Sequence, residues 1–429
     1  MSTTKNISLN DPKVINGWAF FDWANSAYAL VITVAIFPGY FAAITDEEIF
    51  LGGVRFFNSS LYAYAITFSY LVTLILSPIL SGIADYGGRK KFFLRSFTTL
   101  GALACISLFF FKDMNQLWLG LTGSILASIG FAGGLVFYNS YLPEIVTEDQ
   151  YDRVSARGFI FGFVGSVLLL LVNLAMIQKP DWFGIEDSSF AVRLSFLMVG
   201  MWWLGWSLIP FKRLPADQPV KGQASLVKKG FAELEKVWIE LKELTNTKRF
   251  LSAFFFYNAG TQTVLYLAAT FAQKELQFAA DELIKLILIL QILAIGGAFL
   301  FAKLSEWKGN KLSLLTMLVI WIIICVLAYL VQDKNPFYGI AAGVGLVMGG
   351  IQSLSRSTYS KLIPENTEDT TSFFSFYDVV EKGAIIMGTF SFGLIEQLTG
   401  GMRNSILALT VFFMIGIILL VTVKIRNSH

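Results

Sequence analysis

Histidine, cysteine and charge are all scarce in this chain of 429 residues. The one histidine, His429, is the last residue, which excludes histidine metal sites, catalytic triads and buried histidine proton relays. Cys105 and Cys325 lie inside separate apolar runs, so they indicate small apolar fillers and no disulfide framework. Charged residues form 15% of the chain, against about 25% in soluble domains, which argues against a soluble globular protein.

Long apolar segments are abundant instead. The chain is 55% hydrophobic with a mean hydropathy of +0.63, and its apolar runs reach the roughly 20 residues that cross a bilayer core. Backbones in lipid must satisfy their own hydrogen bonds, so runs this long and uniform indicate helices. Twelve membrane-spanning helices are expected, at 17–44, 57–80, 92–111, 116–140, 155–177, 190–211, 250–273, 282–303, 311–330, 336–359, 371–398 and 402–425. No cleavable signal is expected, because the first run is too long and follows a polar start.

The distribution of Lys and Arg predicts the orientation. If the N-terminus is cytoplasmic, only eight of the 33 Lys and Arg residues fall on the far side of the membrane. These are Arg55, Lys112, Lys179, Arg193, Lys274, Lys285, Lys334 and Arg403. Because basic residues favour the cytoplasmic side, both termini are expected there.

The longest polar stretch, 212–249, divides the twelve runs six and six. After Pro215 and Pro219 its apolar residues recur three or four apart, which predicts an amphipathic helix on the inner membrane surface. A regulatory or partner-binding role is the alternative. The expected organisation is a cytoplasmic N-terminus 1–16, a six-helix bundle 17–211, the linker 212–249, a second bundle 250–425 and a tail 426–429.

A short polar motif occurs twice. Segment 81–91 combines Asp85, a glycine turn and a basic cluster, and a weaker copy lies at 303–311. Asp85 and Glu306 are 221 residues apart. Further pairs recur at nearly the same offset, which indicates duplication of one six-helix unit with parallel topology. The predicted fold is therefore all-α and integral to the membrane, with twelve transmembrane helices in two parallel six-helix repeats.

The two copies of the motif are expected to act as latches between the repeats. Glycine permits a tight turn, a carboxylate can accept from a neighbouring helix start, and basic groups can pair with acids of the other repeat. Simple anchoring by positive charge is the alternative for Lys90 and Lys91. The latch residues proposed from the sequence are Asp85, Gly88, Arg89, Lys90, Glu306 and Gly309.

Polar residues inside apolar runs are costly in lipid and indicate function. Asp22 lies in the first run, with Asn25 and Ser26 on its face at i+3 and i+4. Asp22 could meet an amine, carry a proton or neutralise Arg157. For the two smaller side chains, contact between helices is an equal alternative to contact with a solute.

The second repeat carries a similar polar set. Asn258 and Gln262 form an i,i+4 amide pair, and Gln352 lies one turn from Arg356. A guanidinium in a cavity suits a carboxylate through paired hydrogen bonds, so Arg356 is expected to bind substrate or to gate. Contact between helices is the alternative for Asn258.

Three charged residues fall in the eleventh run. Asp378 and Lys382 are spaced i,i+4 with the acid first, so mutual neutralisation is the simplest interpretation. Glu381 is then left as a possible proton carrier, although Lys382 could serve either acid. No metal site is expected.

The 81–91 segment resembles the signature loop of the major facilitator superfamily, with Ser81 at its usual glycine and Tyr86 at its usual arginine. The resemblance implies that Asp85 caps the start of span eleven, here 370–372, and that the latch lacks one arginine. Three further segments, 17–28, 257–263 and 350–357, resemble the vacuole effluxer-like branch, from about Trp18 to Lys424. The best-known members of that branch are implied to export amino acids.

That resemblance places spans one, four, seven and ten around a central cavity. The substrate-cavity residues expected there are Asp22, Asn25, Ser26, Tyr28, Asn258, Gln262, Gln352 and Arg356. The predicted function is a secondary transporter that moves a small polar solute by alternating access, with an amino acid as the first substrate and efflux as the direction. A sugar or drug-like solute is the alternative, and a membrane receptor or structural protein is more remote.

No enzyme, cofactor or nucleic-acid partner is expected. The phosphate-binding pattern Gly-x-x-x-x-Gly-Lys-Ser/Thr is absent, so energy must come from an ion gradient or from the gradient of the solute itself. The expected partners are the solute, a possible coupling proton and the lipid bilayer. The protein is expected to be a monomer in a bacterial cytoplasmic membrane.

Overall fold

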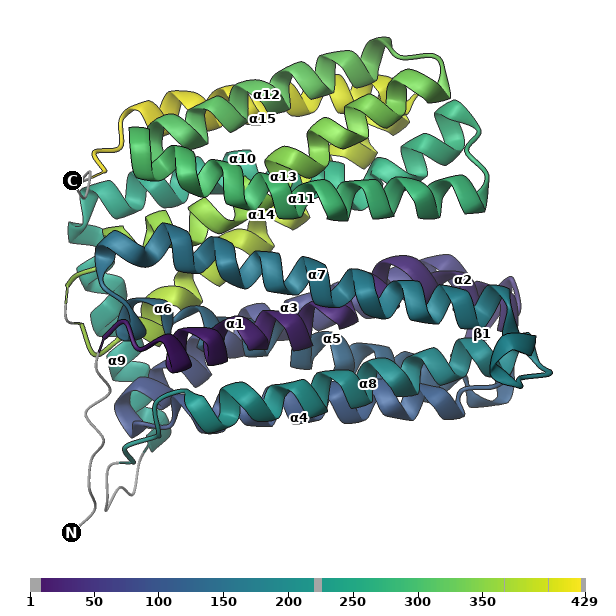
Figure 1. Ribbon diagram of the computed structural model, residues 1–429, viewed down its shortest axis with the longest axis horizontal. Coiled ribbons are helices and arrows are strands. Elements are labelled where there is room, and N and C mark those ends of the chain that lie inside the picture. Colours follow the sequence, from purple (N-terminus) through teal and green to yellow (C-terminus); the bar gives the residue numbers. More distant parts are fainter. Residues whose placement is uncertain (1–8, 220–225, 366, 400, 426–429) are drawn as a thin grey trace. The chain divides into compact units, whose positions relative to one another are not determined.

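The computed structural model describes residues 9–219, 226–365, 367–399 and 401–425, so His429 and the predicted tail 426–429 lie outside the described residues. Each range expected to span the membrane is occupied by a long helix (Figure 1). The helices of the first half are α1 (Pro12–Ala27), the π-helix η1 (Tyr28–Ile36), α2 (Phe37–Ile44), α3 (Asn58–Gly87), α4 (Lys90–Ser107), α5 (Leu117–Asn139), α6 (Leu142–Ile145), α7 (Tyr151–Gln178) and α8 (Ser188–Arg213). Four short 3-10 turns, at Leu108–Phe110, Met114–Gln116, Glu148–Gln150 and Pro180–Phe183, lie between or next to these helices.

The linker helix α9 (Leu226–Glu243) precedes the helices of the second half. These are α10 (Thr245–Leu276), α11 (Ala280–Lys308), α12 (Asn310–Leu330), α13 (Lys334–Leu362), α14 (Thr370–Thr399) and α15 (Met402–Val421). Two short antiparallel strands, β1 (Glu48–Leu51) and β2 (Val54–Phe57), form a hairpin whose turn contains Gly52 and Gly53 at positive φ.

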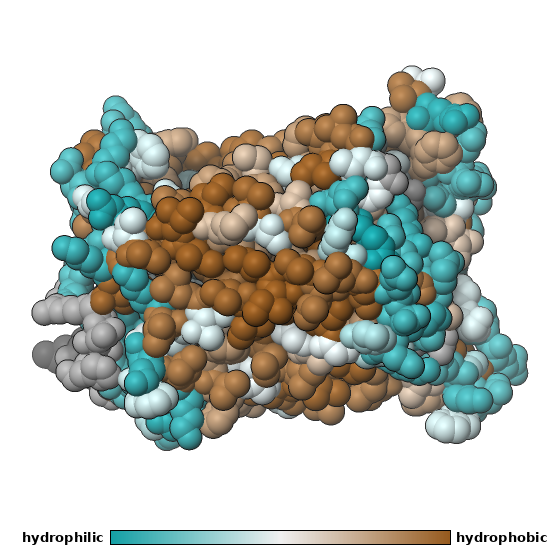
Figure 2. Space-filling model, turned by 90° about the horizontal axis from the view of Figure 1, so that it is seen from above, coloured by the Kyte–Doolittle hydropathy of each residue, from teal (hydrophilic) through white to brown (hydrophobic). Residues whose placement is uncertain are grey.

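Ten helical segments within the described residues are long and apolar enough to cross a membrane. Helices α10 and α14 are not among them, and both carry polar residues along their length. Apolar side chains cover the middle of the face seen in Figure 2, and hydrophilic ones gather at the two ends of the helices. The number of spans and the cytoplasmic position of both termini stay predictions.

Contacts divide the chain into two units. Unit 1 comprises 1–141 and 161–231, and unit 2 comprises 142–160 and 232–429. The boundary therefore falls inside α7, whose first ten residues belong to unit 2. It also falls inside α9, after Phe231.

Unit 1 is a helical bundle in which α1 packs on α8, and α4 packs on both α5 and α8. Its core is rich in aromatic side chains, including the fully buried Trp203. The helices α4 and α5 cross closely at Gly101 and Gly130, where a Cβ on Gly130 would lie 2.4 Å from the Gly101 Cα. The small residues therefore allow the backbones of α4 and α5 to touch, as expected for packing between membrane helices.

Unit 2 is built around α11 and α13, with α10, α12, α14 and α15 packed beside them (Figure 1). Glycines again form the closest contacts. A Cβ on Gly297 would lie 1.8 Å from the Leu346 carbonyl oxygen, and one on Gly349 would lie 2.1 Å from the Ala294 carbonyl oxygen.

Both cysteines are buried and free, which confirms their role as apolar fillers.

The first span is irregular. Residues 28–36 form a π-helix, in which the Phe37 N–H bonds to the carbonyl of Ile32, five residues earlier. Pro38 follows directly, and a proline has no N–H to donate and clashes with the carbonyl four residues before it. The wider turn relieves that clash. Such bulges frequently occur at functional sites, so this part of the span is of interest for solute binding.

Candidate functional site

Asp22 is buried in unit 1 and held by α5. Its carboxylate accepts a hydrogen bond of 2.7 Å from the Tyr138 hydroxyl. The Tyr138 ring stacks on Trp18 and Phe21 at centroid distances of 4.5 and 4.6 Å, and the Trp18 indole donates to the Tyr138 carbonyl at 3.0 Å. The aromatic residues of α1 thus fix the tyrosine that binds the acid. Tyr138 is a neighbour that sequence reasoning missed, because nothing in the sequence pairs it with Asp22.

The other predicted residues of α1 differ in their surroundings. Asn25 is 1% exposed, and its Oδ1 has no hydrogen-bond partner in the described parts of the chain. Ser26 is half-buried beside Gly162 of α7. Tyr28 points into the helix packing, where its hydroxyl lies 2.8 Å from Ser128 Oγ and its ring stacks on Trp203. Asn25 therefore retains the free acceptor that a polar solute could use.

Arg356 of α13 is buried in unit 2 and held by the first turns of α7. Its Nε donates to Ser155 Oγ at 3.0 Å, and its Nη2 donates to the Ser155 carbonyl at 2.8 Å. The Phe159 ring lies over the guanidinium, 4.3 Å from its carbon. Arg157, on the same turns, is exposed and also belongs to unit 2. Ser155 and Phe159 were not predicted, because their role depends on how α7 meets α13.

One turn before Ser155 is a second polar cluster centred on Asp152. The carboxylate of Asp152 accepts from Lys361 Nζ at 2.9 Å, from Asn310 Nδ2 at 2.7 Å and from Ser305 Oγ at 2.9 Å. Lys361 also donates to Asn310 Oδ1 at 2.9 Å. Asp152, Lys361 and Asn310 each bind at least two partners, which is how a buried charge pair can be tolerated.

This cluster changes the interpretation of the 303–311 motif. Glu306 is exposed, and Gly309 forms the turn between α11 and α12 with φ +84°. The buried contacts come from their neighbours Ser305 and Asn310. The motif holds the start of α7 through uncharged groups, while the cation is supplied by Lys361 at the end of α13.

The 81–91 motif is bound to the linker within unit 1. Gly88 has φ +60° and its carbonyl accepts from the Gln218 N–H at 3.0 Å. Asp217 caps the start of α4 by accepting from the N–H groups of Lys91 at 2.7 Å and Phe92 at 2.8 Å. Arg89 is exposed. Lys90 lies over the Tyr141 ring, 5.1 Å from its centroid. Asp217 was missed, although an acid just after a helix and between two prolines is a recognisable signal.

Helix α9 packs directly on the end of α3. A Cβ on Gly82 would lie 2.2 Å from the Gly230 carbonyl oxygen, so the two backbones touch. Lys229 donates to the Tyr86 hydroxyl at 2.6 Å. Tyr86, which stands at the usual arginine of the resembled signature, thus binds the linker helix.

The later part of α9 contacts α14 and the residue before it in unit 2. Lys236 donates to both Asp369 and Glu233 at 2.6 Å, and Trp238 packs on Phe376 at 5.5 Å. Burial is the largest effect on Asp369 and raises its pKa above the ordinary value of 3.8, which the hydrogen bond from Lys236 opposes. The hydrogen bond to Asp369 raises the pKa of Lys236, which stays charged.

Glu144 is a further residue that was not predicted. The Thr370 hydroxyl, at the start of α14, donates to the Glu144 carboxylate. The resemblance assigned the capping of this helix start to Asp85, which belongs to unit 1. Within unit 2 the Glu144 carboxylate binds the side chain of Thr370, the first residue of α14, and the capping role of Asp85 stays a prediction.

The remaining predicted residues lie along α10, α13 and α14. Asp378 and Lys382 form the expected ion pair, and both are buried. Glu381 is half-buried and has no ion pair within the described residues. Asn258 is 4% exposed and its Nδ2 has no partner there either. Gln262 and Gln352 are half-buried, and no hydrogen bond joins Gln262 to Asn258.

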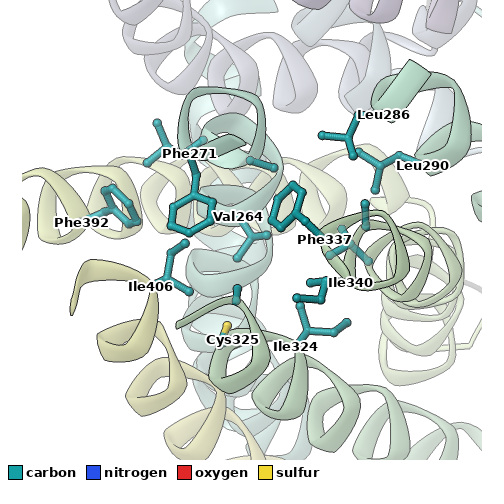
Figure 3. Close-up of a pocket in the computed structure, with 15 residues that line it drawn as sticks. Val264, Phe271, Leu286, Leu290, Ile324, Cys325, Phe337, Ile340, Phe392 and Ile406 are labelled. Carbon is teal, nitrogen blue, oxygen red and sulfur yellow. The ribbon is translucent and has the colours of Figure 1, made fainter. Parts of the chain in front are cut away.

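An apolar cavity of about 40 Å³ lies inside unit 2, enclosed by α10–α15 (Figure 3). Its walls include Phe271, Leu290, Cys325, Phe337 and Ile406, and it contains no polar side chain. A cavity without polar partners does not hold ordered water. It therefore offers no site for a polar solute, and the polar residues above are the better candidates.

Comparisons with known proteins cover nearly the whole chain. The family model described as "Vacuole effluxer Atg22 like" matches residues 10–429. A Bacillus subtilis (strain 168) protein named as an uncharacterized MFS-type transporter, YxiO, is 33% identical over 415 residues, covering 96% of this chain and 95% of the relative. Autophagy-related protein 22 of Saccharomyces cerevisiae (strain ATCC 204508 / S288c) is 24% identical over 423 residues, covering 86% and 78%.

Solved structures share the fold. The major facilitator superfamily transporter FucP, in its outward conformation, superposes with a TM-score of 0.73 at 15% identity, over 97% of this chain and 99% of that one. The human organic anion transporter MFSD10 superposes with a TM-score of 0.70 at 10% identity, over 96% and 100%. At this identity the likeness concerns the fold alone.

Proposed function

Because the chain belongs to the vacuole effluxer Atg22-like family of MFS-type transporters, we propose that it moves a small polar solute by alternating access, with an amino acid as the first candidate. The protein is a multi-pass membrane transporter. In this fold two six-helix repeats rock around a site near the middle of the membrane. The solute class and the efflux direction are the proposed parts.

The observation that carries the proposal is Arg356. It is a buried cation in the middle of a polar run on α13. Ser155 offers it two neutral acceptors, a hydroxyl and a main-chain carbonyl. Charges at such positions are costly and default to function. A carboxylate is the group that a planar guanidinium binds best.

The polar residues of α1 support the ammonium side of the same solute. Asp22 supplies a negative charge in α1, and Asn25 offers an oxygen that has no partner among the described residues. An amino acid carries an ammonium and a carboxylate, the two groups that a carboxylate and a guanidinium bind. A sugar or an organic anion is the second candidate, because proteins of this fold include the fucose:proton symporter FucP and the organic anion transporter MFSD10.

The test is uptake into liposomes that contain the purified protein. Labelled amino acids are offered with unlabelled L-fucose or benzoate as competitors. Uptake that neither competitor reduces, and that Arg356→Ala abolishes, supports an amino acid. Lys112→Ala is the control, because it also removes a basic side chain, an exposed one outside the proposed latch, and leaves Arg356 and Ser155 in place. Normal uptake by Arg356→Ala would remove that residue from the site.

A coupling proton is the second part of the proposal. Glu381 is half-buried on α14 and has no ion pair within the described residues, so it is the first candidate carrier. An imposed pH gradient should drive accumulation in the native protein and should fail to do so in Glu381→Gln, which keeps the shape and removes the titrating group. Accumulation by that variant equal to the native level would exclude Glu381 as the carrier.

A further inference from the structure

The first turns of α7 cover the binding edge of Arg356. Ser155 accepts from the guanidinium twice, through its hydroxyl at 3.0 Å and through its main-chain carbonyl at 2.8 Å. Phe159, one turn later, covers the flat face of the same group. All three residues belong to unit 2. The two donors Nε and Nη2, which form one edge of the fork, are therefore occupied by a single serine.

The direction of these hydrogen bonds is fixed. Ser155 Oγ donates its only proton to the Ser353 carbonyl at 2.7 Å, so it can meet Arg356 only as an acceptor. Ala156 packs in a buried cluster with Ala298 and Ala302 of α11. The first ten residues of α7 are thus held by small apolar contacts, by the Asp152 cluster and by Arg356.

A carboxylate would bind the same edge more strongly than Ser155 does. The acceptors that Ser155 presents are neutral, whereas a carboxylate meets a guanidinium through two parallel hydrogen bonds and adds the attraction of opposite charges. The two acceptors of Ser155 imitate the two oxygens of a carboxylate, since they are spaced to meet adjacent nitrogens of one guanidinium.

We propose that the carboxylate of the solute displaces Ser155 from Arg356, so that solute binding and separation of residues 155–159 of α7 from Arg356 are a single exchange, while the Asp152 cluster keeps the first turn of α7 on α13. Ser155 is then a positioning residue that holds Arg356 in the absence of solute. Phe159, whose ring lies over the guanidinium, moves away together with Ser155. This inference rests on the proposed function and defines its substrate class: a solute with a free carboxylate. Solutes without one leave Ser155 in place.

The exchange predicts that Ser155→Ala raises the affinity for amino acids, although it removes a hydrogen bond. Removing a competing acceptor weakens the contact that holds α7 closed, so more of the protein is ready to bind. The half-saturating concentration of amino acid should fall about ten-fold, as expected for one hydrogen bond to a charged group. If Ser155 only stabilised the fold, its loss would leave affinity unchanged or weaken it.

The measurement is a distance between spin labels on α7 and α11. Both positions, Arg157→Cys and Lys303→Cys, are exposed, and the native Cys105 and Cys325 are replaced by alanine. The probes are an equimolar mixture of L-amino acids and the matching mixture of their amides. The amino acids should lengthen the distance and the amides should leave it unchanged. Arg356→Lys keeps the positive charge but loses the paired donors of the guanidinium, so about ten-fold more amino acid should be needed for the same change in distance.

Ser357→Ala is the matched control, because Ser357 Oγ donates to the Leu354 carbonyl of its own helix and its removal leaves Arg356 and Ser155 untouched. Uptake of the same amino acids is measured in the same preparation. Three results would overturn the exchange while the proposed function stands. These are uptake without a change in distance, an equal change in distance with the amides, and unchanged affinity in Ser155→Ala. Absence of uptake would overturn both.

Discussion

Asp152 and Lys361 lie 209 positions apart in the chain and form an ion pair of 2.9 Å in which both side chains are about 5% exposed. A pair this deeply buried is stable only when its remaining hydrogen bonds are satisfied. Asn310 and Ser305 satisfy them here. The pair fixes the first turn of α7 to the end of α13 within unit 2.

Removing one member of this pair should therefore be costly. Asp152→Ala leaves the Lys361 charge buried without its partner, and such changes cost about 3–5 kcal/mol. The expected result is a large fall in the thermal unfolding temperature of the purified protein. Arg153→Ala, which alters an exposed neighbour, is the control and should change the unfolding temperature little. The double variant Asp152→Leu/Lys361→Met should recover most of the loss, and failure to recover would mean that the pair is not the cause.

Asp217 should contribute to stability through the start of α4. Asp217→Ala removes the acceptor for the Lys91 and Phe92 N–H groups, which costs about 1 kcal/mol for a helix cap. Each N–H group binds a different oxygen, so Asp217→Asn keeps one of the two acceptors and should retain about half of that stability. Chemical unfolding monitored by tryptophan fluorescence compares the two. Equal losses in both variants would show that the charge matters and that the cap does not.

The contact between α3 and α9 should be intolerant of any side chain. Gly82→Ala would place a Cβ 2.2 Å from a main-chain oxygen, which cannot move aside as a flexible side chain could. The linker helix is then expected to separate from α3, and hydrogen exchange of residues 226–231 should accelerate. Gly205→Ala is the control, since nothing lies within 4 Å of the position its Cβ would occupy. Unchanged exchange in Gly82→Ala would contradict the close contact.

The contact between α9 and the start of α14 should depend on pH. Burial raises the pKa of Asp369, so the docked state takes up a proton at a pH where the undocked carboxyl is still ionised. Docking is therefore favoured as pH falls toward the ordinary carboxyl pKa, and weakens as pH rises through the raised value. The raised pKa of Lys236 keeps its cation present throughout this range.

A spin-label distance between Glu235→Cys of α9 and an exposed residue of α14 measures this dependence. In Asp369→Asn the docked distance should persist at all pH values between 4 and 8, because the amide does not titrate. The native protein should show the pH trend and the amide variant should not. A trend retained in Asp369→Asn would show that Asp369 is not its cause.

The sequence alone was sufficient for most of the helical architecture. Runs of apolar residues long enough to cross a bilayer have few alternatives to a helix, so the twelve ranges and the linker helix were found to within several residues. The Asp378–Lys382 pair was also predictable, because both members lie on one helix at a favourable spacing. Local periodicity carries this information.

Contacts between distant segments were not predictable in the same way. Ser155 is an ordinary small residue in the sequence, and only the packing of α7 on α13 makes it the partner of Arg356. Likewise the duplicated motif drew attention to Glu306, whereas the buried contacts come from its neighbours Ser305 and Asn310. A motif locates the turn, but the burial of each side chain is decided by the neighbouring helices.

The π-helix in the first span has a consequence for how relatives can differ in length. A turn closed by the fifth residue contains one residue more than a turn closed by the fourth, so 28–36 holds a local surplus of chain. A relative with one residue fewer before Pro38 could close the same span as a regular α-helix without shifting either end. Single-residue deletions that inactivate most membrane helices are therefore expected to be tolerated here, and gaps in the first span of natural relatives should fall between Tyr28 and Pro38.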